Sequence, residues 1–131
     1  MTHRFLSQVP GTTAGEGLLD SSEIEIGMGI HNEAGAQRVS PVPPLNELVQ
    51  ILLDLLLLQS DPERGFLHTQ GSGKDNVVLL INNLGGVSEL DLGGIAREVV
   101  AALADRGVSV QRLISGTFMV HNSTHFHTRF R

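Results

Sequence analysis

The stretch that decides the fold is NVVLLI (76–81) followed by NNLGGVSEL (82–90). A short continuous apolar run bounded by turn-forming residues is typical of a strand that is covered on both faces. Gly85 and Gly86 permit a tight turn out of this strand, and Ser88 is a suitable N-cap for a helix. The pattern therefore predicts the centre of a sheet at 76–81, followed by a turn and a helix.

That helix should reach about Asp105, because apolar residues recur on one side of it at helical spacing, namely Ile95, Val99, Ala102 and Leu103. Gly107 stands where a glycine ends a helix. The residues 108–117 then alternate in a way that predicts a further strand.

Upstream, SPVPP (40–44) is a stiff connector, and its last proline suits the first turn of a helix. The helix should run from Leu45 to about Gln59. Its interior, LVQILLDLLLL, is apolar nearly all round, which predicts a deeply buried or sandwiched helix. The run is too short to span a bilayer, and Asp54 interrupts it, so we expect no membrane association.

Further upstream, EIEIGMGIHNEAG (23–35) begins as a strand over Glu23–Met28 and continues as a glycine-rich loop that carries His31. Alternation places Ile24, Ile26 and Met28 on one face of the strand. An imidazole in such a loop is either a nucleophile active near neutral pH or a structural hydrogen-bonding group. The residues alone leave both interpretations open.

The order strand, helix, strand, helix, strand predicts an α/β fold, with a layered mixed or parallel sheet and crossover helices. Sites in such sheets lie beyond the carboxyl ends of strands. His31 and the pair Asn82-Asn83 each follow a strand. They should face a common crevice if those strands are parallel and close.

Composition narrows the classes of partner. The chain has 131 residues, 40% of them hydrophobic, which suits one globular domain, and a net charge of -5 disfavours nucleic acid. The absence of cysteine excludes disulfides and thiolate metal sites. The first residues, MTHRFLSQVPGTTAG, lack the apolar core of a signal peptide. We therefore expect a cytoplasmic protein.

Two loops invite a phosphate-binding interpretation. GSGKDN (71–76) lacks the P-loop pattern, because His68 replaces the required glycine and Asp75 follows Lys74. Gly85 and Gly86 precede a helix N-terminus, where backbone N–H groups can hold an anion, but a simple tight turn is the favoured explanation. We therefore expect no cofactor site at either loop.

The end of the chain, VHNSTHFHTRFR (120–131), contains His121, His125 and His127. Imidazoles at such spacings can share a metal ion, although no carboxylate joins them within the segment. The favoured interpretation is a flexible basic end, and no metal site is expected.

Three separated blocks, EIEIGMGIHNEAGAQRV, VVLLINNLGGVSELDLGGIAREVV and RLISGTFM, resemble the dihydroxyacetone (glycerone) kinase family, specifically the second half of its substrate-binding K domain. The resemblance runs from about Glu23 to Met119. It implies that His31 binds dihydroxyacetone covalently as a hemiaminal. The implied organisation is an irregular arm at 1–21, a K-domain fragment at 22–119 and a tail outside the family pattern at 120–131.

The resemblance departs from the family pattern at both ends of the chain and at one residue of the loop. Nothing in residues 1–22 matches the family's N-terminal substrate loop, catalytic aspartate or second histidine, and Ala34 stands where proline is common. The resemblance implies a fragment of a kinase of glycerol metabolism, inactive by itself, that makes dihydroxyacetone phosphate. ATP and Mg²⁺ are expected on a separate nucleotide-binding domain, and a homodimer is an expected assembly. The alternatives are a non-catalytic binding or assembly module and a truncated gene product without a stable role.

Overall fold

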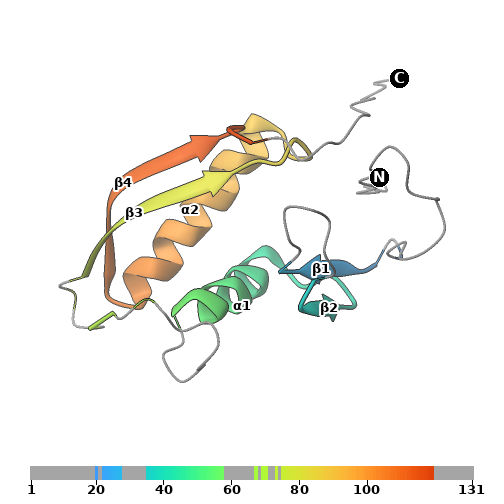
Figure 1. Ribbon diagram of the computed structural model, residues 1–131, viewed down its shortest axis with the longest axis horizontal. Coiled ribbons are helices and arrows are strands. Elements are labelled where there is room, and N and C mark those ends of the chain that lie inside the picture. The colour runs from blue at the N-terminus through green and yellow to red at the C-terminus, as the bar shows by residue number, and fades with distance from the viewer. Residues whose placement is uncertain are drawn as a thin grey trace.

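The structure is a computed structural model that describes residues 20, 22–27, 35–57, 67, 69–70, 73 and 75–119. Along these residues the chain forms six elements, in the order β1 (Ile24–Ile26), β2 (Gln37–Val39), α1 (Leu45–Leu57), β3 (Asp75–Asn82), α2 (Glu89–Asp105) and β4 (Val108–Gly116). They make two two-stranded sheets and two helices, a mixed α/β arrangement that confirms the predicted fold class (Figure 1).

The larger sheet pairs β3 with β4 in parallel, with α2 as the connection between them. The pairing runs from Asp75 opposite Val108 to Asn82 opposite Gly116. The register shifts after Val77, which pairs with Val110, because Val78 pairs with Arg112. The bulge leaves Gln111 as the additional residue of β4. Both strand predictions are confirmed to within a residue or two.

The core lies between this sheet and the two helices. Its buried cluster joins α1, the end of α2 and the start of β4, and consists of Val49, Leu53, Ala102, Leu103 and Val108. Half-buried residues of the sheet and helices pack around the cluster, namely Leu57, Val77, Leu79, Val99 and Val110. Residues distant in the sequence therefore meet in one apolar cluster, which is the main source of stability for the fold.

Both ends of α2 are capped as the sequence predicts. Ser88 is the N-cap, and its side-chain oxygen accepts a hydrogen bond from the backbone N–H of Asp91 at 3.1 Å. Gly107 follows the C-cap with φ 75, a conformation that favours glycine, and its N–H donates to the carbonyl of Ala104. The chain therefore turns directly from α2 into β4.

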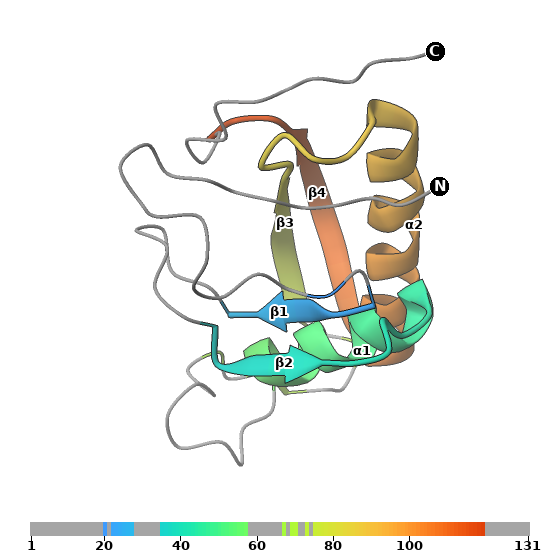
Figure 2. The same cartoon turned by 90° about the vertical axis from the view of Figure 1, so that its right-hand side faces the viewer.

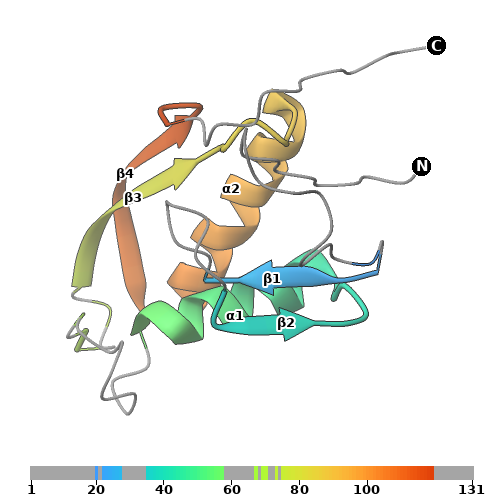
Figure 3. The ribbon, with the colours of Figure 1, turned by 45° about the vertical axis from the view of Figure 1, so that its right-hand side comes forward.

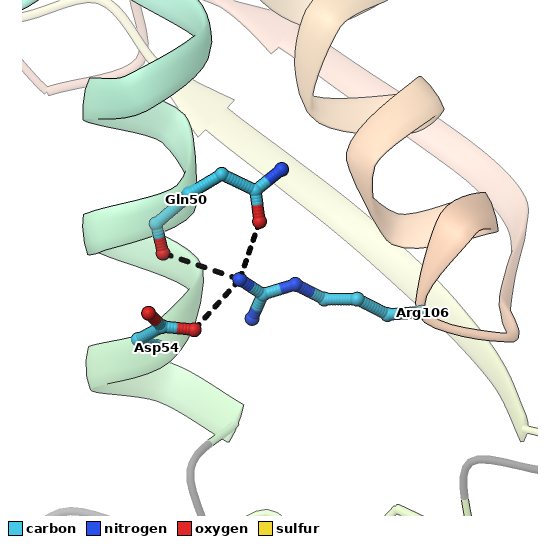
Figure 4. A network of polar contacts seen from close by, with 3 residues as sticks. All are labelled: Gln50, Asp54 and Arg106. Atoms are coloured by element: carbon cyan, nitrogen blue, oxygen red, sulfur yellow. Dashed lines mark hydrogen bonds and ion pairs between the residues drawn. The ribbon is translucent and has the colours of Figure 1, made fainter.

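One arginine connects the two helices (Figure 4). The Arg106 Nη2 atom donates to Gln50 Oε1 at 2.6 Å and to Asp54 Oδ1 at 2.7 Å, and it lies 3.3 Å from the backbone carbonyl oxygen of Gln50. The arginine belongs to the turn after α2, and both of its partners belong to α1. This contact is solvent-exposed and joins α1 to the turn after α2 at the edge of the apolar helix interface.

The smaller sheet is a hairpin in which β1 pairs antiparallel with β2, from Ile24 opposite Val39 to Ile26 opposite Gln37. Its strands run in opposite directions beside α1 (Figures 2 and 3). Ile26 is buried. The short strand β2 was not predicted, because the three residues QRV carry no apolar alternation.

The predicted coverage of β3 on both faces is wrong for the described residues. Side-chain exposure alternates along the strand, so Val77 and Leu79 pack on the core while Val78 and Leu80 are 63% and 60% exposed. The uniform burial predicted for α1 is wrong for the same reason: only Val49 and Leu53 are buried. One apolar face of each element packs against the core, and the opposite face is open.

Neither described helix is long and apolar enough to cross a membrane.

Candidate functional site

The predicted site residue, His31, lies outside the residues that the structure describes. The structure does describe both ends of its segment. Strand β1 ends at Ile26, Gly27 follows with φ 81, and the described chain resumes at Gly35, two residues before β2. The positive φ at Gly27 suits a residue without a Cβ. The segment 28–34 therefore connects two points of a hydrogen-bonded hairpin.

A carboxylate connects these two points across the hairpin. Glu25 Oε1, on β1, accepts a hydrogen bond of 2.7 Å from the backbone N–H of Gly35. The bond is short because its acceptor is charged. It holds the point at which the chain returns from the His31 segment against the strand that leads into it.

The second predicted locus, Asn82-Asn83, lies at the carboxyl end of β3. The Asn82 side chain accepts hydrogen bonds from the backbone N–H groups of Phe118 and Met119, and donates to the Met119 carbonyl at 2.9 Å. It thus continues strand pairing with a side-chain amide in place of a backbone one. Its role in the described structure is to hold the chain that leaves β4.

Asn83 is buried, and its side chain is satisfied within the turn that follows. Its Oδ1 accepts from the N–H groups of Gly85 at 2.9 Å and Val87 at 3.3 Å, and its Nδ2 donates to the Val87 carbonyl. These are the N–H groups that an anion would use. Two acidic residues, Glu89 and Asp91, also lie in the first turn of α2. The arrangement supports the interpretation of a structural turn over that of a phosphate cradle.

We predicted a common crevice on the condition that the strands before His31 and Asn82-Asn83 are parallel and close, and this condition is not met. Strand β1 pairs with β2 in a separate sheet, and β3 pairs with β4, so β1 and β3 are not parallel neighbours. The hairpin lies beside α1, whereas the carboxyl ends of β3 and β4 lie at the other end of α2 (Figure 1). Adjacency of strands therefore does not bring Asn82-Asn83 to the His31 segment.

Other predicted positions lie outside the described residues, including Met28, Lys74 and the histidines of the tail, His121, His125 and His127. Where the chain is described, no three His, Asp or Glu side chains gather as a metal site would require.

Sequence reasoning missed the role of Glu25. It singled out only the apolar residues of this strand. The contact depends on how the chain returns after the loop, and no local pattern in the sequence indicates that return.

The comparisons with known proteins decide the family. The sequence profile of the Dak1 domain matches residues 6–124. The chain belongs to the Dak1 family. A dihydroxyacetone kinase of Pichia angusta is 49% identical over 102 residues, which is 77% of this chain and 16% of that protein. A triokinase/FMN cyclase of Mus musculus is 41% identical over 111 residues, which is 85% of this chain and 18% of that protein.

The Dak1 chain thus spans less than a fifth of these relatives, at 16% and 18% of their lengths. A solved structure with the same fold is the dihydroxyacetone kinase operon co-activator Dha-DhaQ, with a TM-score of 0.64 and 22% identity over 86% of this chain and 32% of that one. A second is described as regulation of the dha operon of Lactococcus lactis, with a TM-score of 0.61 and 23% identity over 79% of this chain and 30% of that one. At such identities the likeness establishes the fold.

Proposed function

We propose that this chain is the ketone-binding segment of a dihydroxyacetone kinase and that His31 forms a covalent hemiaminal with dihydroxyacetone. The observation that carries the proposal is the position of GMGIHNEAG (27–35), which lies within the Dak1 match and between two hairpin points tied together by Glu25. The names of the relatives, dihydroxyacetone kinase and triokinase/FMN cyclase, support a three-carbon ketone as the ligand.

The proposed step needs a neutral imidazole. A ring nitrogen of His31 with a free lone pair attacks the carbonyl carbon of dihydroxyacetone, a C–N bond forms, and the π electrons of the carbonyl move to oxygen. The resulting alkoxide takes a proton, and the second ring nitrogen loses one, so that the adduct is a neutral hemiaminal. Protonation of the imidazole removes the lone pair and prevents the step.

This chemistry selects among small ligands. Dihydroxyacetone and short aldehydes offer an electrophilic carbon, whereas glycerol offers hydroxyl groups only. A histidine anchor therefore distinguishes ketone from polyol by bond formation, which gives a larger difference than hydrogen bonding to similar hydroxyl groups provides.

Transfer of a phosphoryl group requires a donor, Mg²⁺ and in-line positioning. The turn between β3 and α2 is poorly suited to a nucleotide phosphate, because Asn83 occupies the N–H groups of Gly85 and Val87, and the first turn of α2 is acidic. In the proposal, ATP and Mg²⁺ belong to a separate nucleotide-binding domain of the whole kinase. We also propose that the whole kinase is cytoplasmic and homodimeric and that it makes dihydroxyacetone phosphate.

The experiment uses dihydroxyacetone labelled with ¹³C at its carbonyl carbon. With saturating ketone near neutral pH, the labelled carbon should acquire a bound resonance typical of a tetrahedral carbon, and peptide mapping should place the added mass on His31. The signal should vanish in His31→Gln, persist in the matched control His125→Gln, and weaken under acidic conditions that protonate the imidazole. An adduct that persists in His31→Gln, or no adduct in the unaltered chain, would refute the proposal.

A second role is favoured by one observation, the exposure of Val78 and Leu80 on the outer face of β3 at 63% and 60%. Adjacent apolar side chains on an open sheet face are suited to association, which an assembly module needs. The two roles are separable by sedimentation, because self-association rises with protein concentration and ketone binding does not require it.

A further inference from the structure

The Glu25 side chain is a partly buried carboxylate in a small hairpin. Its exposed fraction is 9%, against 52% for Arg38, which lies opposite it in the register. Burying a carboxylate is costly unless strong hydrogen bonds compensate. The arginine provides little of this, because Arg38 Nη2 lies 3.9 Å from Glu25 Oε2, beyond hydrogen-bonding distance. The strong contact of Glu25 is the 2.7 Å bond from the backbone N–H of Gly35.

Position 35 is shaped around this contact. A Cβ on Gly35 would lie 2.7 Å from the backbone carbonyl oxygen of Ile26 and would collide with Glu25 Cγ. The φ of Gly35 is not in the left-handed region. Glycine is therefore required at this position because the backbone at Gly35 lies so close to β1. The contact between the Glu25 carboxylate and the backbone at position 35 therefore leaves no room for a side chain at position 35.

We infer that Glu25 is a positioning residue for the His31 segment: its carboxylate fixes the N–H of Gly35 and hence the distance that residues 28–34 must span from Gly27. The inference rests on the proposed ketone chemistry of His31. Glu25 acts through the backbone and takes no proton in the proposed step. Precise placement of a reacting group contributes strongly to a covalent step, since small displacements reduce the population of reactive geometries.

Two variants separate the reach of the side chain from its charge. Glu25→Gln keeps an acceptor oxygen at the same distance along the side chain but loses the charge, whereas Glu25→Asp keeps the charge and is one methylene shorter. If the contact with Gly35 is what matters, Glu25→Gln should resemble the unaltered chain more closely than Glu25→Asp does. Arg38→Gln is the matched control for the ion pair, and Glu23→Gln is the control for a β1-flanking carboxylate that accepts from Asp20 instead.

The first measurement is hydrogen exchange of the Gly35 amide, followed by NMR. In Glu25→Asp this amide should exchange about tenfold faster, because it loses a hydrogen bond to a charged acceptor, and its proton resonance should move upfield. The urea midpoint of the whole chain should stay close to that of the unaltered protein. Arg38→Gln and Glu23→Gln should leave the Gly35 amide unchanged.

The second measurement is the apparent affinity for labelled dihydroxyacetone, read from the His31 adduct. It should fall about tenfold in Glu25→Asp and in Gly35→Ala, and it should be retained in Glu25→Gln and Arg38→Gln. Equal losses in Arg38→Gln and Glu25→Asp would overturn the inference, because the ion pair would then be the important contact.

The two proposals fail in different ways. An adduct that forms in the unaltered chain and is unaffected in Glu25→Asp supports the ketone chemistry and overturns the positioning role. No adduct in the unaltered chain, with Gly35 exchange still raised in Glu25→Asp, refutes the ketone chemistry and leaves Glu25 only as a contact within the hairpin, which also overturns its role in positioning.

Discussion

The helix-backed sheet and the β1–β2 hairpin differ in what holds them together. The sheet of β3 and β4 packs with both helices around a cluster of buried apolar side chains drawn from three elements. The hairpin has strands of three residues each, one buried apolar side chain at Ile26, and a carboxylate–amide bond. A two-stranded hairpin of this size has little stability of its own. The difference teaches that global stability and the geometry of the β1–β2 hairpin depend on separate sets of contacts.

The comparison implies first that core substitutions dominate stability. Leu103→Ala removes a buried side chain from the central cluster and should lower the free energy of unfolding by about 2–5 kcal/mol. The matched control is Leu80→Ala, at a residue 60% exposed on the open face of the sheet, which should cost less than about 0.5 kcal/mol. Urea unfolding followed by circular dichroism measures both. Equal losses would mean that the outer face of β3 is covered in solution.

A smaller effect is expected where the sheet ends. Asn83→Ala leaves the buried N–H group of Gly85 and the partly buried N–H group of Val87 without their acceptor, and should cost about 1–3 kcal/mol. Asn82→Ala is the matched control, because its partners at 118–119 are exposed and water can replace the lost bonds. Urea midpoints and exchange rates of the two turn amides test this. A larger loss in Asn82→Ala would show that the chain after β4 contributes more than the turn does.

The smallest effect should be a gain. Gly94 lies inside α2, and a Cβ built there meets no heavy atom within 4 Å, so Gly94→Ala should stabilise the chain by about 0.5–1 kcal/mol. Gly107→Ala should do the opposite, because φ 75 disfavours a side chain. Thermal unfolding of the two variants distinguishes them. Destabilisation by Gly94→Ala would reveal an element that packs against this helix.

Most of the helix-backed sheet could be predicted from the sequence, because its signals are local and strong. The run at 76–81 predicts a strand, Ser88 predicts the start of a helix, and the glycine at 107 predicts its end. The structure has β3, α2 and β4 at these places. Which faces are covered could not be predicted. An apolar run such as NVVLLI indicates a capacity for burial on two sides, while coverage depends on what packs against it.

Less of the site could be predicted. The glycine-rich loop with His31 stands out by its composition, but β2 and the Glu25–Gly35 contact depend on how the chain returns after the loop. That return is a tertiary property which no periodicity encodes. The common crevice was predicted on the condition that the two strands are parallel and close. That condition is not met, because the order of elements does not determine which strands pair, and β1 pairs with β2.

The open face of β3 has a consequence for how this chain responds to temperature. Val78 and Leu80 remain largely hydrated in the folded state, so unfolding transfers less apolar surface to water than the number of ordered residues implies. The heat-capacity change on unfolding scales with that surface. A reduced heat-capacity change flattens the curve of stability against temperature, and a small core gives a small melting enthalpy. The chain should therefore melt over a broad range and lose little stability in the cold.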